Sequence, residues 1–347
     1  MGQRKREIGS LDLDVNSYFK VEENFMTILR QPTRAGVRDA AAKLAVILLP
    51  SPLFIHEING IAVAFKAESL QPIGSFKLRG AWHRLTAIDS ESRARGVVAF
   101  SSGNHAQGVA WAAKRLGMPA LIVMPSDAPV VKREATLAMG AEIVSYDRAT
   151  ESREKIAAGL AGARGAALVP SFDDPWIIEG QGSAAIEAAT QMAAQGLPAP
   201  SHVVVPCGGG GLAAGCALAL PDAVITVVEP EGWDDMRVSL EAGWIEPVGP
   251  KPPPTACDSL QTKEVSRLTF DVLSRRGVRG LAVSEVEIAA AQRWAARHLR
   301  IVVEPGGAAG LAALLAGKVS VEPGMLVMVS GGNVDPAAYA AVLSGAD

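Results

Sequence analysis

The sequence predicts an α/β protein built on mostly parallel sheets. From about residue 96 onward, short runs of β-branched residues alternate with alanine-rich segments whose apolar residues recur at helical spacing. The strand-like runs are apolar throughout, as expected for strands that helices cover on both faces. A chain of 347 residues is long for one hydrophobic core, so two domains are expected.

Each predicted element has a clear sequence signal. The expected strands are Val97–Phe100, Ala120–Met124, Glu142–Ser145, Ala167–Pro170, His202–Pro206, Val224–Glu229 and Met325–Ser330. The expected helices between them are Ala106–Leu116, Glu151–Leu160, Gln181–Ala194, Leu212–Leu218, Glu285–His298 and Gly307–Leu315. Five prolines from 247 to 254 predict a loop. The first 35 residues are predicted to form an extension of unassigned role, with a helix over Val21–Arg30.

Composition excludes several function classes. The formal net charge is −3, from 33 basic and 36 acidic residues, so neither nucleic acid nor a membrane surface is an expected partner. Cys207, Cys216 and Cys257 have neither the count nor the spacing of a disulfide framework or a zinc site, which favours a reducing compartment. No apolar signal segment follows the basic start, and the apolar run 44–49 stops far short of the roughly 20 residues that span a bilayer. A cytoplasmic protein is expected.

The segment GSFKLRGA at 74–81 sets Lys77 in a frame of small and aromatic residues. Burial lowers the pKa of a lysine amine, and the neutral amine is the nucleophile that Schiff-base chemistry needs. Phe76 would supply an apolar wall, and the flanking glycines leave room for a flat ring. On this segment alone, a solvated loop lysine is the more common alternative.

Four glycines, Gly208 to Gly211, join a predicted strand to a predicted helix. Such a loop can surround a phosphate with backbone N–H groups at the helix N-terminus. A dinucleotide site stays open, because Glu229 follows at about the distance of a ribose-binding carboxylate. A purely structural turn is the third alternative.

Two further segments follow predicted strands, where open α/β sheets collect their ligands. Ser101, Ser102, Asn104 and His105 open a helix and could hold a substrate carboxylate, although an ordinary serine cap is as common. Ser330 ends the last strand, where a hydroxyl could bond a neutral ring nitrogen, and a plain glycine turn is the alternative.

An acidic loop follows the strand that ends at Glu229. Glu231, Asp234 and Asp235 give it the oxygen atoms that Mg²⁺ or Ca²⁺ prefers. Solvated acidic turns are more frequent than metal sites, so the loop alone does not decide between them.

Taken together and in this order, these motifs resemble the serine/threonine dehydratase and serine racemase family, which includes hydroxyaspartate dehydratases. Its members are fold-type II enzymes that depend on pyridoxal 5′-phosphate. The resemblance covers about residues 40 to 345, and Ser-Gly-Asn-His at 102–105 separates it from O-acetylserine sulfhydrylases, which usually have Thr-Gly-Asn-Thr. It implies two open twisted sheets with the cofactor between a large domain (1–88 and 174–347) and a small domain (89–173), and a homodimer.

The resemblance also implies roles for individual residues. Lys77 would form the Schiff base and later act as base at Cα, and Phe76 would pack against the ring. Asn104 would bond the ring's 3′-oxygen, Ser330 the pyridine nitrogen and Gly208, Gly209, Gly210, Gly211 and Leu212 the phosphate, with Glu304 near the ring. Ser101, Ser102, Asn104 and His105 would contact the substrate.

Two positions bear on the reaction. Family racemases and hydroxyaspartate dehydratases commonly have serine where this chain has Ser102, and in the racemases this serine is the acid/base on the ring face opposite the lysine. The family's divalent cation site uses a glutamate, a carbonyl four residues on and an aspartate two further, and Glu229, Trp233 and Asp235 match this spacing. Mg²⁺ or another divalent cation is therefore implied as a second cofactor.

The chain departs from the family pattern in two places. Pro170 and Ser171 begin a segment that often reads His-Pro-Phe-Asp-Asp-Pro, and Cys257-Asp258-Ser259 replaces Ala-Asp-Gly near the expected substrate side chain. The leading interpretation is a dehydratase that converts a β-hydroxy-α-amino acid to a 2-oxo acid and ammonia. L-Threonine and L-serine are the default substrates and 3-hydroxyaspartate competes with them. A racemase is the second interpretation, and a nucleotide-binding oxidoreductase or a non-catalytic binding protein is the third.

Overall fold

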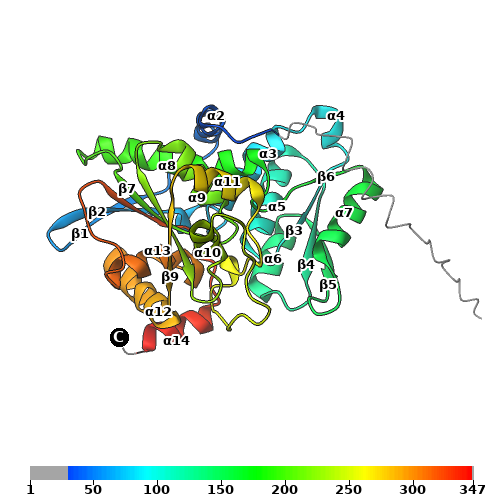
Figure 1. Cartoon of the computed structure of the whole chain (residues 1–347). Helices are drawn as coiled ribbons and strands as arrows, with labels where there is room; N and C mark the ends of the chain where they lie inside the picture. Colours follow the sequence, from blue (N-terminus) through cyan, green and yellow to red (C-terminus); the bar gives the residue numbers. More distant parts are fainter. Residues whose placement is uncertain (1–29, 346–347) are drawn as a thin grey trace, which may run out of the picture. The chain divides into compact units, whose positions relative to one another are not determined.

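The computed structural model describes residues 30–345, and within this range the chain forms two open sheets (Figure 1). One sheet has the strand order β1-β2-β10-β7-β8-β9 and the other β5-β4-β3-β6. The strands of the first are β1 (Leu53–Ile58), β2 (Ile61–Ala67), β10 (Met325–Val329), β7 (His202–Pro206), β8 (Val224–Pro230) and β9 (Arg279–Val283). Those of the second are β5 (Glu142–Tyr146), β4 (Ala120–Pro125), β3 (Val97–Phe100) and β6 (Ala167–Leu168). All pairings are parallel except β1 with β2, which confirms the predicted fold class.

Helices connect and cover these strands. They are α2 (Arg34–Ala45), α3 (Lys77–Thr86), α4 (Ser90–Arg93), α5 (Asn104–Leu116), α6 (Val130–Ala138), α7 (Arg153–Arg164), α8 (Pro175–Ala194), α9 (Gly211–Ala219), α10 (Asp235–Ala242), α11 (Arg267–Arg275), α12 (Glu285–Trp294), α13 (Pro305–Leu315) and α14 (Pro336–Ser344). Short 3₁₀ turns lie at η1 (Glu68–Leu70) and η2 (Asp258–Leu260), and a π turn lies at η3 (Ala295–Leu299). None of the helices between residues 30 and 345 is long and apolar enough to cross a membrane.

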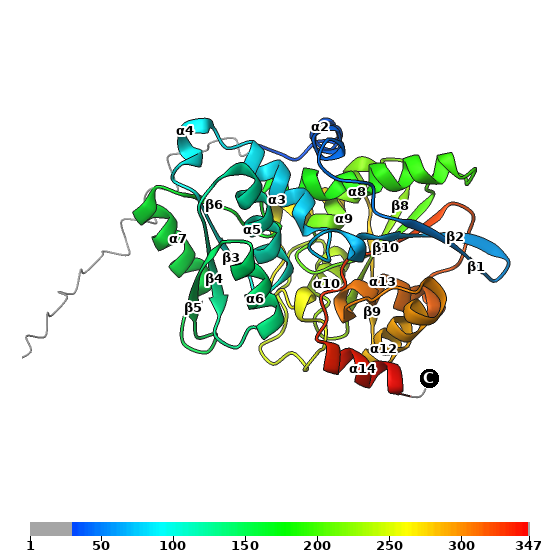
Figure 2. The same cartoon turned by 180° about the vertical axis from the view of Figure 1, so that it is seen from behind.

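The alternation of side chains along each strand explains why both sheets are covered on both faces. In the smaller sheet, Ala99 packs in one apolar cluster with residues of α5, whereas its neighbour Val98 packs with Ala157 and Ala161 of α7. Successive side chains of a strand point to opposite faces, so an apolar run needs helices on each side. Seen from behind, α3, α5 and α6 lie on one face of this sheet, while α12 and α14 lie below the larger one (Figure 2).

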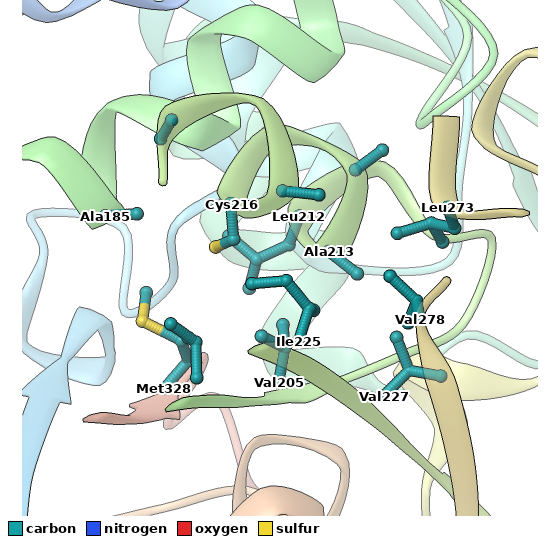
Figure 3. Close-up of a cluster of buried hydrophobic side chains, with 14 of the residues drawn as sticks. Ala185, Val205, Leu212, Ala213, Cys216, Ile225, Val227, Leu273, Val278 and Met328 are labelled. Atoms are coloured by element: carbon teal, nitrogen blue, oxygen red, sulfur yellow. The ribbon is translucent and has the colours of Figure 1, made fainter. Parts of the chain in front are cut away.

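The larger sheet packs against α8 and α9 through a core of small and branched side chains. Val205, Ile225 and Met328 from three strands meet Leu212 and Cys216 of α9 in this cluster (Figure 3). Close approach of α9 to α8 requires glycine, because a Cβ at 182 or at 215 would lie 2.5 Å from the other helix's backbone. This packing fixes the start of α9, which is where the tetraglycine segment lies.

The predicted strands all occur, with ends that differ by a few residues, but three further strands were not predicted. β1 and β2 form a hairpin whose turn, Asn59-Gly60, has positive φ at both residues, and they precede the region where the alternation begins. β9 is a partly buried edge strand without a strong apolar run. The predicted helix Glu285–His298 is also wrong at its end, since α12 stops at Trp294 and the π turn follows.

Two expectations stay untested. Most of the extension 1–35 lies outside the described residues, and with it the helix predicted over 21–30. At the end of the extension, α2 begins at Arg34, and the side chain of Thr33 caps it. We retain the division into a large domain (1–88 and 174–347) and a small domain (89–173) as a proposal, in which the smaller sheet would belong to the small domain.

Candidate active site

One cavity gathers almost all the predicted site residues at the carboxyl ends of strands from both sheets. Its walls include Phe76, Lys77, Ser101, Ser102, Asn104, His105, Gly208, Gly209, Gly210, Gly211, Leu212, Glu304 and Ser330. These residues come from segments as far apart in sequence as Phe76 and Ser330. The three predicted metal ligands, Glu229, Trp233 and Asp235, do not line this cavity.

Lys77 is the first residue of α3 and projects its amine into the cavity. The Nζ atom donates a hydrogen bond to the carbonyl oxygen of Ser171 at 3.0 Å and lies 5.2 Å from the centre of the Phe76 ring. Burial lowers the pKa of the Lys77 amine to about 8, and the Glu304 carboxylate partly opposes this shift. A substantial neutral fraction of this amine is therefore present near physiological pH.

Glu304 precedes α13 and accepts a hydrogen bond from the amide of Asn104, which Asn333 holds in turn. Asn104 Nδ2 donates to Glu304 Oε1 at 2.5 Å, and Asn333 Nδ2 donates to Asn104 Oδ1 at 2.8 Å. The other oxygen, Glu304 Oε2, is buried without a hydrogen-bond partner. Burial raises the pKa of Glu304 to about 7, although the Lys132 ammonium lowers it. This carboxyl group can therefore take up or release a proton near neutral pH.

The tetraglycine segment forms a narrow turn between β7 and α9. A Cβ at Gly209 would lie 2.2 Å from the Phe172 ring, and Gly210 has φ +83°, a conformation that side chains rarely adopt. Gly211 begins α9, so free backbone N–H groups of a helix N-terminus meet the cavity wall here. The turn therefore combines close backbone approach with the donors and the positive dipole end that favour a phosphate.

The start of α5 forms another part of the cavity wall. Gly103 N donates to Ser101 Oγ at 3.1 Å, and Asn104 is the first residue of the helix. His105 is buried, and its Nε2 contacts the carbonyl oxygen of Val169 at 2.9 Å. Burial, together with the nearby Lys77 charge, lowers the pKa of His105 to about 3, so the imidazole is neutral at pH 7.

The sequence analysis missed two cations of this cavity. Lys132, from α6, donates to Asp258 Oδ2 at 2.5 Å and lies 3.8 Å from Glu304 Oε2. Arg153, the first residue of α7, places its guanidinium 5.4 Å from the centre of the Phe100 ring. Neither residue belongs to a motif, and only the fold brings α6 and α7 to this wall. Asp258 lies in the segment that departs from the family pattern, which is the one signal that pointed to this region.

The predicted metal ligands lie at the end of β8 and the start of α10. Glu229 is buried and accepts hydrogen bonds from the backbone N–H groups of Met236 (3.2 Å) and Arg237 (2.8 Å). Asp235 is 2% exposed, and neither of its carboxylate oxygens has a hydrogen-bond partner. Trp233 donates its indole N–H to the carbonyl oxygen of Pro253 at 2.8 Å. No group of three or more His, Cys, Asp or Glu side chains with metal-binding geometry occurs in residues 30–345.

Comparison with known proteins gives a consistent result. A family model described as pyridoxal-phosphate dependent enzyme matches residues 47–331. An L-threo-3-hydroxyaspartate ammonia-lyase of a Pseudomonas species is 42% identical over 316 residues, which cover 88% of this chain and 97% of that protein. A serine racemase of Schizosaccharomyces pombe is 38% identical over 323 residues, covering 90% and 98% of the two chains.

A solved structure agrees with these relatives. The crystal structure of a T.th. threonine deaminase superimposes with a TM-score of 0.81 at 39% identity, covering 88% of this chain and 99% of that one. The match spans nearly the whole of the other chain, so the similarity concerns the complete fold.

Proposed function

Because this chain belongs to the pyridoxal-phosphate dependent enzyme family, we propose that it is an ammonia-lyase that acts on a β-hydroxy-α-amino acid, with L-threo-3-hydroxyaspartate as its preferred substrate. This proposal rests above all on one observation: the amine of Lys77, the tetraglycine turn and the start of α5 line the same cavity. L-Threonine and L-serine are the alternative substrates.

The residues of the cavity fit pyridoxal phosphate. We assign the phosphate to the turn Gly208–Gly211 with Leu212, because Gly209 and Gly210 leave no room for a side chain and helix N–H groups are free. Phe76 would pack on the ring, and Asn104, Glu304 and Ser330 would meet its polar edge. When bound, the cofactor supplies an electron sink that makes the α-hydrogen of an amino acid acidic.

The chain's own groups then handle protons and charge. Nζ of Lys77 is proposed to accept the α-proton, a role that its lowered pKa supports. The α-carboxylate would bind at the start of α5, where Ser101 and Ser102 lie beside a helix N-terminus and His105 is neutral.

Two cavity cations support a substrate with a second carboxylate. Lys132, which pairs with Asp258, and Arg153, whose Nε donates to Glu154 Oε1 at 2.8 Å, line the same cavity in addition to Lys77. L-Threonine and L-serine have no second carboxylate to pair with them, whereas 3-hydroxyaspartate has its β-carboxylate. We therefore rank 3-hydroxyaspartate first.

The test is release of 2-oxo acid, coupled to NADH oxidation by added dehydrogenases. L-threo-3-hydroxyaspartate should be turned over with a kcat/KM at least about tenfold above L-threonine and L-serine. Lys77→Ala should remove turnover and the visible absorbance of the bound cofactor together. A yellow protein that releases no oxo acid from any of the three would contradict the proposal.

Racemisation is the second candidate, supported by the position of Ser102 on the cavity wall and by the serine racemase relative. A hydroxyl on the far side of the substrate from Lys77 could return a proton to Cα. Ser102→Ala should then abolish racemisation of L-serine, measured by chiral chromatography, while oxo-acid release continues. Equal loss of both activities would argue against this role.

We further propose a Mg²⁺ site at Glu229, the carbonyl of Trp233 and Asp235. The two unpartnered carboxylate oxygens of Asp235 and the buried carboxylate of Glu229 fit a hard divalent cation whose other positions are filled by water. After dialysis against a chelator, added Mg²⁺ at about 100 times its Kd should stabilise the protein by about 3 kcal/mol. Asp235→Asn should remove that stabilisation, and an unchanged response would refute the site.

Two further proposals concern the oligomeric state of the protein and its location in the cell. Val46 and Leu49, just after α2, are 84% and 89% exposed, which supports a homodimer that would cover them. Light scattering of the wild type and of Val46→Ser/Leu49→Ser would test this, with a monomeric wild type contradicting it. The three free buried thiols support a cytoplasmic location, which cell fractionation would test.

A further inference from the structure

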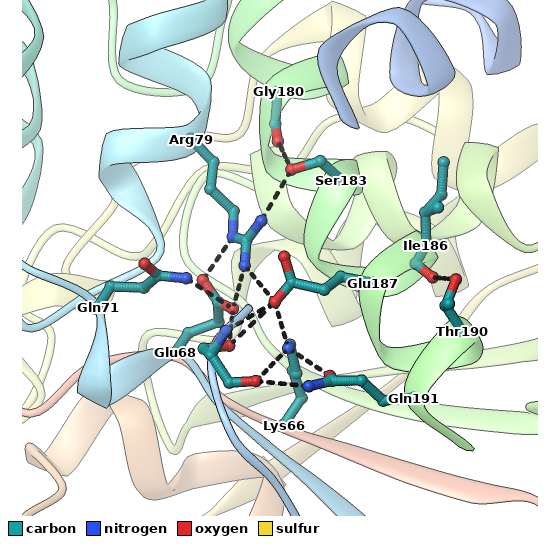
Figure 4. A network of polar contacts seen from close by, with 11 residues as sticks. Lys66, Glu68, Gln71, Arg79, Gly180, Ser183, Ile186, Glu187, Thr190 and Gln191 are labelled. Carbon is teal, nitrogen blue, oxygen red and sulfur yellow. Dashed lines mark hydrogen bonds and ion pairs between the residues drawn. The ribbon is translucent and has the colours of Figure 1, made fainter. Parts of the chain in front are cut away.

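A buried cluster of ionised side chains lies outside the cavity, where β2 and η1 meet α3 and α8. We call it the Arg79 network (Figure 4). Its members are Ser51, Lys66, Glu68, Arg79, Ser183, Glu187 and Gln191. Lys66, Glu68 and Arg79 are at most 1% exposed. None of the network residues lines the cavity, and the function proposed above does not use them.

Arg79 is the centre of this network. Its Nε and Nη2 donate to the two oxygens of Glu68 at 2.7 and 2.8 Å, which is a two-pronged contact that fixes orientation as well as distance. Nη2 also donates to Glu187 Oε1 at 3.0 Å, and Nη1 lies 3.3 Å from Ser183 Oγ. The guanidinium thus joins η1 to α8 from a position in the first turn of α3.

The first turn of α3 is anchored from outside the helix at two points, by the Arg79 side chain and by Gly80 N, which donates to Gln181 Oε1 at 3.0 Å. The residue before the helix, Phe76, provides no side-chain cap, and the backbone N–H of Arg79 donates to the carbonyl oxygen of Phe76 at 3.0 Å. A displacement of Arg79 therefore passes directly to the turn that contains Lys77. Phe76 N is itself held by the carbonyl oxygen of Ser330 at 3.2 Å, so the anchor acts on a short segment fixed at both ends.

We propose that Arg79, through its paired contact with Glu68, is a positioning residue that sets the direction in which Lys77 presents its amine to the cavity. The inference rests on the proposed function only in taking Lys77 as the proton acceptor. A misplacement of a reacting group by about 1 Å can reduce a rate about a hundredfold, so the anchor matters even though it touches no substrate.

Lys66 provides a matched control inside the same network. Its Nζ donates to Glu187 Oε1, to Gln191 Oε1 at 2.7 Å and to the carbonyl oxygen of Ser51 at 2.7 Å. It is as buried as Arg79 but comes from β2, and it makes no hydrogen bond to α3. Replacement of Lys66 should therefore lower the stability of the fold without changing the orientation of the Lys77 side chain.

The experiment compares Arg79→Lys, Glu68→Gln and Lys66→Met with the wild type, all as holoenzyme. Arg79→Lys keeps the charge but cannot make the two-pronged contact with Glu68, and Glu68→Gln disrupts the same contact by changing its acceptor. Both should lower kcat at least about tenfold with KM within about twofold. Lys66→Met should lower the melting temperature but keep kcat within about twofold.

A second measurement does not need turnover. Competitive acetylation of the apoprotein, read by mass spectrometry on the peptide that carries Lys77, gives the pKa of this amine. The charged or titratable groups that act on it are Glu304 and His105, and none of the variants changes them. The pKa should rise from about 8 in Arg79→Lys and Glu68→Gln, as water reaches a loosened turn, and stay near 8 in Lys66→Met.

The outcomes separate the two proposals. If kcat falls equally in Lys66→Met and Arg79→Lys, or if Arg79→Lys and Glu68→Gln keep both kcat and the Lys77 pKa, the positioning role is overturned. A wild type without oxo-acid release would overturn the proposed function alone, because the Lys77 pKa comparison would still decide the role of Arg79. If Arg79→Lys does not fold, Glu68→Gln carries the same test.

Discussion

The Arg79 network and the cavity around Lys77 lie on either side of one helical turn, and both bury ionisable groups. In the network, Glu68 is completely buried, yet the paired Arg79 holds its pKa below the ordinary value. In the cavity, burial is the larger effect, so the pKa of Lys77 falls to about 8 and that of Glu304 rises to about 7. Pairing gives Glu68 and Arg79 fixed charges that orient the chain, although burial lowers the pKa of Lys66 in the same network. Incomplete pairing leaves the cavity groups able to exchange protons near neutral pH.

The largest expected effect follows from replacing Lys77 by methionine. Turnover should fall roughly a thousandfold or more, since the proposed proton acceptor is lost. The apoprotein should at the same time become more stable, by up to about 3 kcal/mol at pH 7, because an amine whose pKa is lowered by burial destabilises the fold. Urea unfolding of both apoproteins measures this difference.

The pH dependence of that gain is a control. Between about pH 8 and pH 10.5 the unfolded chain still binds the proton that the folded one has released. The wild-type apoprotein therefore gains stability across this window as pH rises, and its deficit relative to Lys77→Met should vanish near pH 10.5. A constant difference across the window would mean that the amine is not the cause.

The same substitution at two buried glutamates should have opposite consequences. Glu68→Gln leaves Arg79 without its counter-charge and should destabilise the protein by about 3–5 kcal/mol. Glu304→Gln removes a carboxyl group whose pKa is raised to about 7, so the apoprotein should be unchanged or more stable at pH 7. Thermal unfolding of both apoproteins at pH 7 tests the pair.

A series of unfolding measurements at different pH values tests whether the raised pKa of Glu304 is the cause of its effect on stability. The unfavourable contribution of Glu304 is absent below about pH 4.5, develops as pH rises to about 7 and remains above it. Any stabilisation by Glu304→Gln should follow that course. Equal destabilisation by both variants at pH 7 would show that the cavity is as fully paired as the network.

The sequence predicted the class of fold and the cavity motifs because those signals are local. A buried parallel strand such as Val203–Val205 is apolar in itself, and the glycine turn at 208–211 is required by close backbone approach. The contacts of Lys132, Arg153 and Arg79 could not be predicted in the same way. Lys132 pairs with Asp258 and Arg79 with Glu187, and Arg153 lies against the ring of Phe100. These partners are distant in the chain, so only the folded arrangement of helices brings the groups together.

The smallest expected effect compares two glycines of the cavity's uncharged wall. A methyl group at Gly209 would lie 2.2 Å from the Phe172 ring, whereas one at Gly208 would lie 3.1 Å from Thr262 Oγ1. Gly209→Ala must displace the ring or the turn, at about 1–3 kcal/mol, while Gly208→Ala requires a shift of a few tenths of an ångström. Pyridoxal phosphate should bind Gly209→Ala about tenfold or more weakly than wild type, and Gly208→Ala within about threefold, by fluorescence titration. If both variants bound the cofactor equally weakly, neither position of the turn would tolerate a methyl group, and the whole turn would be as rigid as the residues paired around Arg79.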